Sequence, residues 1–305
     1  MRRTLVKPLR IHELAKAYLA SQPLPLDRSR GGRPRTFDDA MILALLGIQN
    51  LYQLSFREAL EFSEDYFREL PSLATYHYRI QKLPLELVQE FVTYVGNQIR
   101  AMDPEPNPNL VIMDGSGFSY HDVYPMSFYG GLEIRKIQAH VKAAALVGLL
   151  NKKRFVLSAR AGPPYTGDTK LVEPMLNNLH QPDSYVLGDK GFDSIKLLEL
   201  ILDKHWTPVI DMKAGRINKI KHPLRQLSKA NVIQLGLYTK RTLIEGLFGN
   251  LKQKLSSHVR IFNLATAEKF VLMRFALLNM AVLASLEKTR DLWLWFSNSA
   301  NPAPE

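Results

Sequence analysis

The sequence predicts an α/β protein in which a mixed β-sheet follows a helical N-terminal region. Residues 37–101 carry apolar side chains at helical spacing, whereas residues 110–211 alternate short apolar runs with helical segments. Three prolines in residues 103–109 separate the two patterns, and each proline disfavours both helix and sheet. We therefore expect a helical, basic domain over 1–101, a linker over 102–110, an α/β domain over 111–290 and a tail over 291–305.

The expected elements of the α/β domain follow from its apolar runs. Strands are expected at residues 110–113, 137–149, 154–159, 184–187 and 207–211. Helices are expected at residues 170–179, 194–204, 238–255 and 265–286. This order predicts a mixed sheet flanked by helices. Residues 213–233 are expected to form a basic insertion or loop.

Composition restricts the class of partner. Lys and Arg number 40 against 29 Asp and Glu, which gives a net charge of +11 over 305 residues. Such an excess favours nucleic acid or an anionic membrane surface. Cysteine is absent, which excludes disulfides, zinc ribbons and thiol nucleophiles. Residues 270–286, the most apolar stretch, contain Arg274 and Asn279 and are short for a membrane span, so we expect a cytoplasmic protein with no membrane partner.

The helical region fits a DNA-binding helix-turn-helix. Ser55 and Glu58 form a capping-box pattern, and Thr75 is expected to cap a short helix that runs to Lys82. This short helix would be the recognition element, with Arg79 and Lys82 contacting DNA. A plain helical bundle explains the pattern equally well.

Residues 1–36 are strongly basic. Arg33 and Arg35 lie in the segment Arg-Gly-Gly-Arg-Pro-Arg, which resembles an arm that enters the minor groove of DNA. A basic linker is an equally good interpretation of this segment.

Two aspartates follow apolar runs that we interpret as buried strands. Asp114 precedes Gly115 after one run, and Asp189 follows Gly188 after another. In α/β sheets ligands collect at the ends of strands, so both carboxylates are candidate site residues. Taken singly, each aspartate is more often an ordinary turn residue beside a glycine.

A third carboxylate lies in a helical pattern. Tyr238, Arg241, Glu245 and Lys252 are spaced so that all four share one face of a helix. The opposite face is apolar and can pack on a sheet, so the helix would present a carboxylate surrounded by Arg, Lys and a phenol. The alternative is a solvated stripe with an i,i+4 ion pair between Arg241 and Glu245.

Three carboxylates from two strand ends and one helix can hold two divalent cations. Such a pair of cations clamps the attacking and leaving oxygens of a phosphodiester. Hard oxygen ligands suit Mg²⁺ or Mn²⁺, and neighbouring Arg, Lys and Tyr side chains would hold the phosphates.

Together these motifs resemble the bacterial insertion-sequence transposases of the DDE type. The resemblance rests on Asp114 in Val-Ile-Met-Asp-Gly-Ser, on Asp189 in Val-Leu-Gly-Asp-Lys-Gly-Phe-Asp-Ser, and on the signature Tyr238-x2-Arg241-x3-Glu245-x6-Lys252. It implies an RNase H-like catalytic domain that holds two Mg²⁺ ions on the three carboxylates.

The same resemblance implies the reaction and the partners. Water would cleave double-stranded DNA at the inverted repeats that end the element, and the freed 3′-hydroxyl would join to target DNA. Tyr238, Arg241 and Lys252 would contact DNA near the cleaved end. Pairing two ends implies at least a homodimer in the DNA complex, in the bacterial cytoplasm at the nucleoid.

Three weaker motifs accompany these. His140 and Lys142 look like a His-x-Lys element often seen on the second strand of such proteins, although simple packing beside Asp114 is the favoured interpretation. Asp168 and Asp193 are each expected to cap the helix that follows.

Two other functions remain open at this point. One is a non-catalytic DNA-binding regulator derived from a transposase, which the three acids argue against without excluding it. The other is a structure-selective nuclease of the same fold, which would use the same metal ions but would not join DNA ends.

Overall fold

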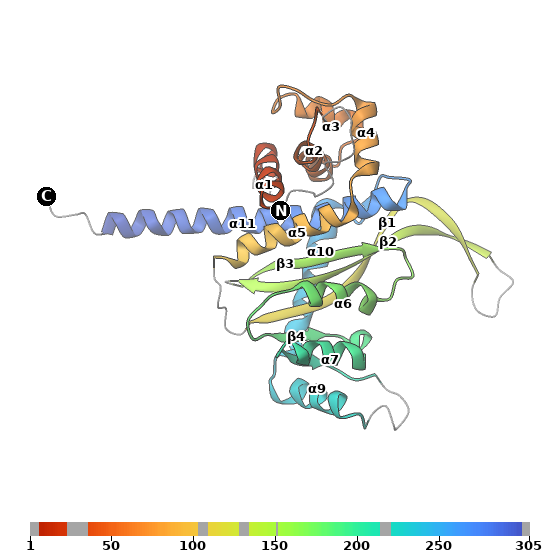
Figure 1. Ribbon diagram of the computed structural model, residues 1–305, viewed down its shortest axis with the longest axis vertical. Helices are drawn as coiled ribbons and strands as arrows, with labels where there is room; N and C mark the ends of the chain where they lie inside the picture. Colours follow the sequence, from red (N-terminus) through yellow and green to blue (C-terminus); the bar gives the residue numbers. More distant parts are fainter. Residues whose placement is uncertain are drawn as a thin grey trace.

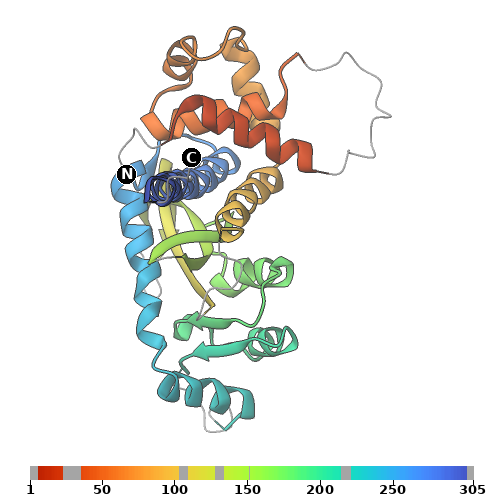
Figure 2. The same cartoon turned by 90° about the vertical axis from the view of Figure 1, so that its left-hand side faces the viewer.

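The computed structural model describes residues 6–22, 36–102, 109–127, 134–150, 152–213 and 221–300, without the side chains of 123–127, 134–138 and 290–300. A group of helices lies above a twisted sheet, and a long C-terminal helix runs between them (Figure 1). Turning the molecule shows that α10 covers one face of the sheet and α6 and α7 cover the other (Figure 2). Arg33, Arg35 and most of the expected linker lie outside the described residues.

The first five helices form the N-terminal helical region. They are α1 Pro8–Ser21, α2 Asp39–Tyr52, α3 Phe56–Ser63, α4 Leu73–Lys82 and α5 Leu85–Arg100. The capping box at the start of α3 is confirmed, since Ser55 and Glu58 exchange side-chain and backbone hydrogen bonds. Helix α4 begins earlier than expected, because the Ser72 hydroxyl accepts from the N–H of Thr75 and so takes the capping position.

The strands form one mixed sheet in the order β3-β2-β1-β4-β5. They are β1 Leu110–Ser127, β2 Ile134–Leu150, β3 Lys153–Gly162, β4 Tyr185–Gly188 and β5 Thr207–Ile210. Strands β1, β2 and β3 pair antiparallel, whereas β1, β4 and β5 pair parallel. A short strand, β6 His258–Val259, pairs parallel with the outer part of β1. The predicted mixed sheet is therefore confirmed.

Strand β1 is much longer than the four residues expected, and Asp114 lies within it rather than at its end. The strand continues because β2 pairs with it beyond Asp114, through Gly115 and Gly117. These glycines do not make a turn. A Cβ atom on Gly115 would lie 1.9 Å from Asp168 Oδ1, so glycine is needed there for close approach.

The remaining helices surround the sheet. They are α6 Asp168–Asn178, α7 Ile195–Asp203, α9 Pro223–Gln234, α10 Thr242–Leu255 and α11 Leu264–Ala300. Helix α9 corrects the expectation of a loop over residues 213–233. It is anchored by the buried Ser228 hydroxyl, which bonds both the N–H and the carbonyl of Ile210 at the end of β5. Helix α11 continues to Ala300, beyond both the end expected for it and the start of the expected tail.

Helix α11 joins the helical region to the sheet through a shared core. Its segment Leu264–Thr289 is long and apolar enough to cross a membrane, but 78% of the apolar window is buried within the protein. The Asn279 side chain bonds both backbone groups of Val156 in β3. A Cβ atom on Gly96 of α5 would lie 2.4 Å from the Val156 carbonyl oxygen. The apolar surface of this helix is thus used for internal packing.

Candidate active site

Asp114 and Asp189 lie beside each other on neighbouring strands. The parallel register of β1 and β4 joins Ile112 to Leu187. Each aspartate is two residues farther along, Asp114 within β1 and Asp189 directly after the end of β4, and the charge of Asp189 acts on the Asp114 carboxyl. Asp189 Oδ1 also accepts the N–H of Gly191 at 2.7 Å and so begins the short η2 helix, Lys190–Phe192. The turn interpretation and the site interpretation therefore both describe Asp189.

The Asp114 carboxyl is half-buried, and its surroundings disfavour the ionised form. Burial raises its pKa to about 6. The charge of Asp189 adds to the rise, whereas the Gly115 N–H, which donates to Asp114 Oδ1 at 2.8 Å, and the Arg241 guanidinium oppose it. Negative charge is thus concentrated where β1 and β4 meet, and a perturbed carboxyl of this kind is a recognised marker of functional sites.

Glu245 is held by an ion pair. Its Oε1 lies 2.8 Å from Nη1 of Arg241, and 52% of the Glu245 side chain is exposed. Burial works against the charge of Arg241, but the bond to Glu245 raises the pKa of Arg241 above its usual value. Arg241 also acts on Asp114. One guanidinium therefore pairs with Glu245 and also acts electrostatically on Asp114, and the i,i+4 pair that the sequence allowed as an alternative is present.

The signature residues do not all share one helix, which corrects the expected single face. Tyr238 and Arg241 belong to a 3₁₀ turn, η3 Tyr238–Arg241, and α10 begins at Thr242. The Arg241 guanidinium lies 5.9 Å from the Tyr238 ring centroid. Lys252 lies farther along α10, with Nζ 5.1 Å from the ring of Phe118 on β1. Burial lowers the pKa of Lys252.

The carboxylates do not form a closed metal site in this conformation. Among the described residues, no three His, Asp or Glu side chains are grouped closely enough to hold a metal ion. Asp114 and Asp189 nevertheless offer adjacent hard oxygen donors, which suit Mg²⁺ or Mn²⁺. The donor chemistry fits such ions, provided that Glu245 leaves Arg241 to join the pair.

Behind Gly115, an ion pair supports β1. Lys142 Nζ on β2 lies 2.8 Å from Asp168 Oδ1 at the start of α6. Asp168 is therefore not a helix cap as expected, because Gly167 holds that position and Asp168 turns toward the sheet. Asp168 also raises the pKa of Asp114. The Lys142–Asp168 pair could not be found from the sequence, because only the packing of α6 against the sheet brings these residues together.

Asp193 is also not the helix cap that the sequence suggested. Ser194 holds the capping position of α7, and Asp193 is buried instead. Its Oδ1 lies 2.8 Å from Nε of Arg225 on α9, and its Oδ2 accepts the N–H of Lys213. This ion pair ties the basic segment to the loop that carries Asp189.

Among the expected N-terminal DNA contacts, Arg79 and Lys82 have different surroundings. Arg79 donates to Asp39 and to the Phe37 carbonyl, both at 2.6 Å, and its side chain is only 11% exposed. These bonds give Arg79 a structural task between α4 and α2. Lys82 is exposed, and its Nζ lies 6.0 Å from the Tyr78 ring. A DNA-reading role for α4 stays a prediction.

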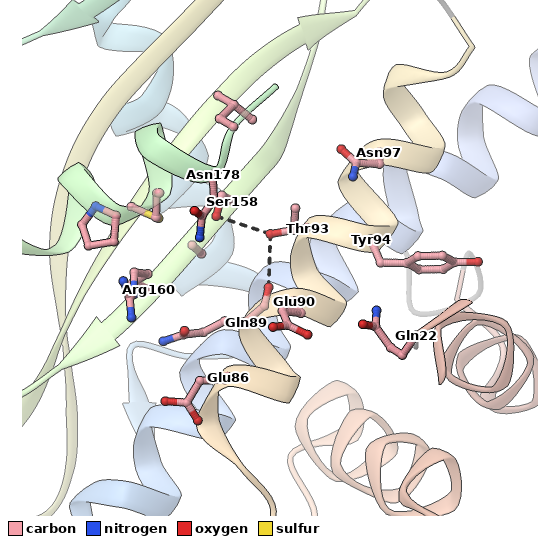
Figure 3. Close-up of a pocket in the computed structure, with 14 residues that line it drawn as sticks. Gln22, Glu86, Gln89, Glu90, Thr93, Tyr94, Asn97, Ser158, Arg160 and Asn178 are labelled. Carbon is pink, nitrogen blue, oxygen red and sulfur yellow. Dashed lines mark hydrogen bonds between the residues drawn. The ribbon is translucent and has the colours of Figure 1, made fainter. Parts of the chain in front are cut away.

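A separate cleft of about 410 Å³ lies between α5, β3 and α6 (Figure 3). Its wall includes Glu90, which accepts from the Tyr18 hydroxyl, and Thr93, which bonds Ser158 at 3.3 Å. None of the candidate catalytic carboxylates lines it. The Thr93–Ser158 bond joins α5 to the sheet, and the Tyr18–Glu90 bond joins α1 to α5.

The strand order and the paired aspartates define the class of protein, an RNase H-like fold with acids on its central strands. A sequence profile of the transposase DDE domain matches residues 105–280, more than half of the chain. The chain therefore belongs to the DDE transposase family. An uncharacterised protein of Aquifex aeolicus (strain VF5) is 29% identical over 265 residues, which cover 86% of this chain and 83% of that protein.

Proposed function

We propose that this protein is the transposase of an insertion sequence, which cuts DNA at the ends of the element and joins the freed 3′-hydroxyl to target DNA. One observation carries the proposal. Asp114 lies on β1 and Asp189 directly follows β4, each two residues beyond the paired Ile112 and Leu187, inside the region that matches the DDE family. Their shared negative charge suits the phosphoryl chemistry of that family.

Asp114, Asp189 and Glu245 are the residues that would hold two Mg²⁺ ions, for which Mn²⁺ would substitute. When bound, such a pair of ions stabilises the attacking and leaving oxygens of the phosphodiester. Burial raises the pKa of Asp114 most, and the charge of Asp189 adds to the rise. This supports the assignment, because a bound cation would offset both effects by stabilising the ionised carboxylate.

The Arg241–Glu245 pair gives DNA a way to complete the site. A DNA phosphate competes with the Glu245 carboxylate for the guanidinium of Arg241, since arginine binds both anions through charge-assisted hydrogen bonds. Once Arg241 turns to the phosphate, Glu245 is released toward the aspartates. Glu245 is half exposed, so its side chain has room for this movement.

Double-stranded DNA is the proposed partner along one continuous path. Tyr238, Arg241 and Lys252 would bind next to the cleaved phosphate. The basic N-terminal residues Arg33, Arg35 and Lys82 would also contact DNA, with Arg79 holding α4 in place. Two copies of the chain would act together on the paired ends, in the cytoplasm at the bacterial nucleoid.

The test uses purified full-length protein and the genomic DNA on both sides of its coding sequence. Wild-type protein with Mg²⁺ is expected to cut this DNA. Asp114→Asn, Asp189→Asn and Glu245→Gln should each lower cleavage roughly thousandfold, with DNA binding retained. Asp203→Asn, an exposed acid at the end of α7, is the matched control and should cut normally. Near-normal cleavage by any of the three site variants would refute the assignment.

A second assay separates the transposase from a nuclease. A pre-cut 3′ end offered together with supercoiled plasmid should be joined to the plasmid by a transposase. A structure-selective nuclease yields only cuts, and a regulator derived from a transposase binds specifically without cutting. Joined product therefore supports the proposed function, and its absence together with cutting overturns it.

A further inference from the structure

An exposed aromatic pair stands at the outer end of β1, away from the acids. The Phe262 ring is 80% exposed. The ring of His121 stacks on it, with centroids 5.4 Å apart and planes inclined by 26°. His121 lies on the same strand as Asp114, roughly 20 Å farther along at the usual rise per residue. We name His121 and Phe262 the aromatic platform.

The backbone beneath the platform is pinned on both sides. The His121 N–H donates to the Ile261 carbonyl at 2.9 Å, which ties the turn carrying Phe262 to β1. The buried guanidinium of Arg274 donates to the carbonyls of Ser256 and His258 at 2.9 and 2.8 Å. The exposed ring therefore projects from a fixed support, whereas a lone exposed apolar residue on a loose loop would need no explanation.

The plane of the His121 ring is also fixed. Its Nδ1 lies 3.1 Å from Nε2 of His258, and Nδ1 of His258 lies 3.0 Å from the Ser119 hydroxyl. Burial and nearby positive groups lower the pKa of His258, which favours its neutral form. This chain of contacts holds one aromatic face against Phe262 and leaves the outer face of Phe262 open.

The surroundings of the platform are suited to a phosphate. Arg260, two residues before Phe262, is exposed, and its charge acts on His258 beneath the platform. Arg260 and His258 also line a cleft of about 200 Å³, together with Gln53. Helix α11 begins just beyond Phe262 at Leu264, and the N-terminal end of a helix carries partial positive charge. A flat π-surface beside cationic groups matches a nucleotide, with its base on the ring and its phosphate on the guanidinium.

We propose that the aromatic platform stacks an unpaired base of the DNA, while Arg260 binds the adjacent phosphate. The choice of DNA as the occupant rests on the proposed function and on the strongly basic chain. The platform is distinct from the carboxylate site. It would recognise DNA whose base pairs are opened or distorted at a distance from the cut.

The test compares two short duplexes of equal length, one fully paired and one with a single unpaired adenine. Binding is measured by fluorescence anisotropy in EDTA, so that no cleavage is needed. Wild-type protein is expected to prefer the unpaired duplex by about tenfold, the usual scale of base stacking on an aromatic side chain. Phe262→Ala should abolish this preference with little effect on the fully paired duplex.

Two further variants identify the kind of contact. Phe262→Trp should keep the preference, and Phe262→Leu, which retains apolar area without a π-face, should lose it. Ile233→Ala removes another apolar side chain that is 72% exposed, on α9, and should change nothing. The melting temperature of each variant checks that it is folded.

Three results would overturn the proposal. The first is a preference that survives in Phe262→Ala, and the second is a preference that Phe262→Leu keeps in full. The third is an effect of Phe262→Ala on the dimer fraction in sedimentation alone. The last outcome would make the platform a contact between two copies of the chain. Failure of the wild-type protein to bind either duplex would instead count against the proposed function itself.

Discussion

Asp114 on β1 and Asp189, directly after the end of β4, each lie two residues beyond the paired residues Ile112 and Leu187. The sequence separates them widely, and only the crossover through α6 brings β4 beside β1. Burial raises the pKa of Asp114, and the nearby charge of Asp189 raises it further. The predictions below depend on this pair and on the groups that support it.

Asp114→Asn is expected to stabilise the metal-free protein above pH 6. Folding raises the pKa of Asp114 from 3.8 to about 6. Between these values the native state holds a proton that the unfolded chain has lost, so stability falls as pH rises through this window. After allowance for solvent screening, the variant should gain about 1 kcal/mol at neutral pH. The gain should vanish below pH 3.8, where both states are protonated.

Urea denaturation in EDTA at several pH values measures this effect. Asp203→Asn is the matched control and should give the same small change at every pH. A gain for Asp114→Asn that does not depend on pH would show that ionisation of the carboxyl is not its cause.

Arg241→Gln is expected to tighten Mn²⁺ binding in the absence of DNA. The substitution removes the partner of Glu245 and a positive charge that acts on Asp114. An exposed ion pair contributes less than about 1 kcal/mol, so the affinity should rise roughly two- to fivefold. Electron paramagnetic resonance of free Mn²⁺ measures it. The control Lys240→Gln removes an equal charge from the same turn. An equal rise in Mn²⁺ affinity in that control would show that the loss of any positive charge explains the effect, and not the release of Glu245.

Asp168→Asn is expected to lower the pKa of Asp114. The charge of Asp168 contributes to the raised value, and the uncharged amide removes that contribution. Carbon-13 NMR of labelled aspartate carboxyls can follow the titration. Glu173→Gln, on the same helix but paired with Lys196 at the surface, should leave the titration of Asp114 unchanged. An unchanged pKa in Asp168→Asn would place Asp168 outside the electrostatic environment of the site.

Gly96→Ala is expected to destabilise the protein by about 2 kcal/mol or more. The added Cβ would lie 2.4 Å from the Val156 carbonyl oxygen, so α5 must move away from β3. Gly249→Ala, in α10, has open space for its methyl group and should instead stabilise by about 1 kcal/mol through helix propensity. Thermal denaturation of both variants compares them. Equal changes in stability for the two variants would mean that α5 and β3 can move apart at little cost in free energy.

Most helices and strands were predictable because their apolar residues follow the period of the element. Helix α9 was not, since it buries little more than Ser228 and therefore lacks an apolar stripe. The predicted ends of helices and strands were wrong where contacts with other residues set the boundary. Pairing with β2 extends β1 past Asp114, and Ser72, not Thr75, caps α4.

The candidate site was likewise predictable in part: its residues could be selected from the sequence, but the ion pairs around them could not. Residue types and spacing were enough to select Asp114, Asp189 and Glu245, because a motif is a local property of the chain. The sequence could not assign Asp168 to Lys142 or Asp193 to Arg225, since each pair joins different elements. From the sequence, Asp168 and Asp193 were each expected to cap a helix, but in the structure both form long-range ion pairs instead.

The sequence by itself determined the α/β class and most of the order of strands and helices, and it selected the three candidate acids, since these depend on periodicity and on residue types carried by single segments. The tertiary structure decided which acids face each other, how Arg241 divides its charge between Glu245 and Asp114, and where Phe262 is exposed. These depend on strand register and on packing between distant segments, because electrostatic and stacking interactions act only over a few ångströms.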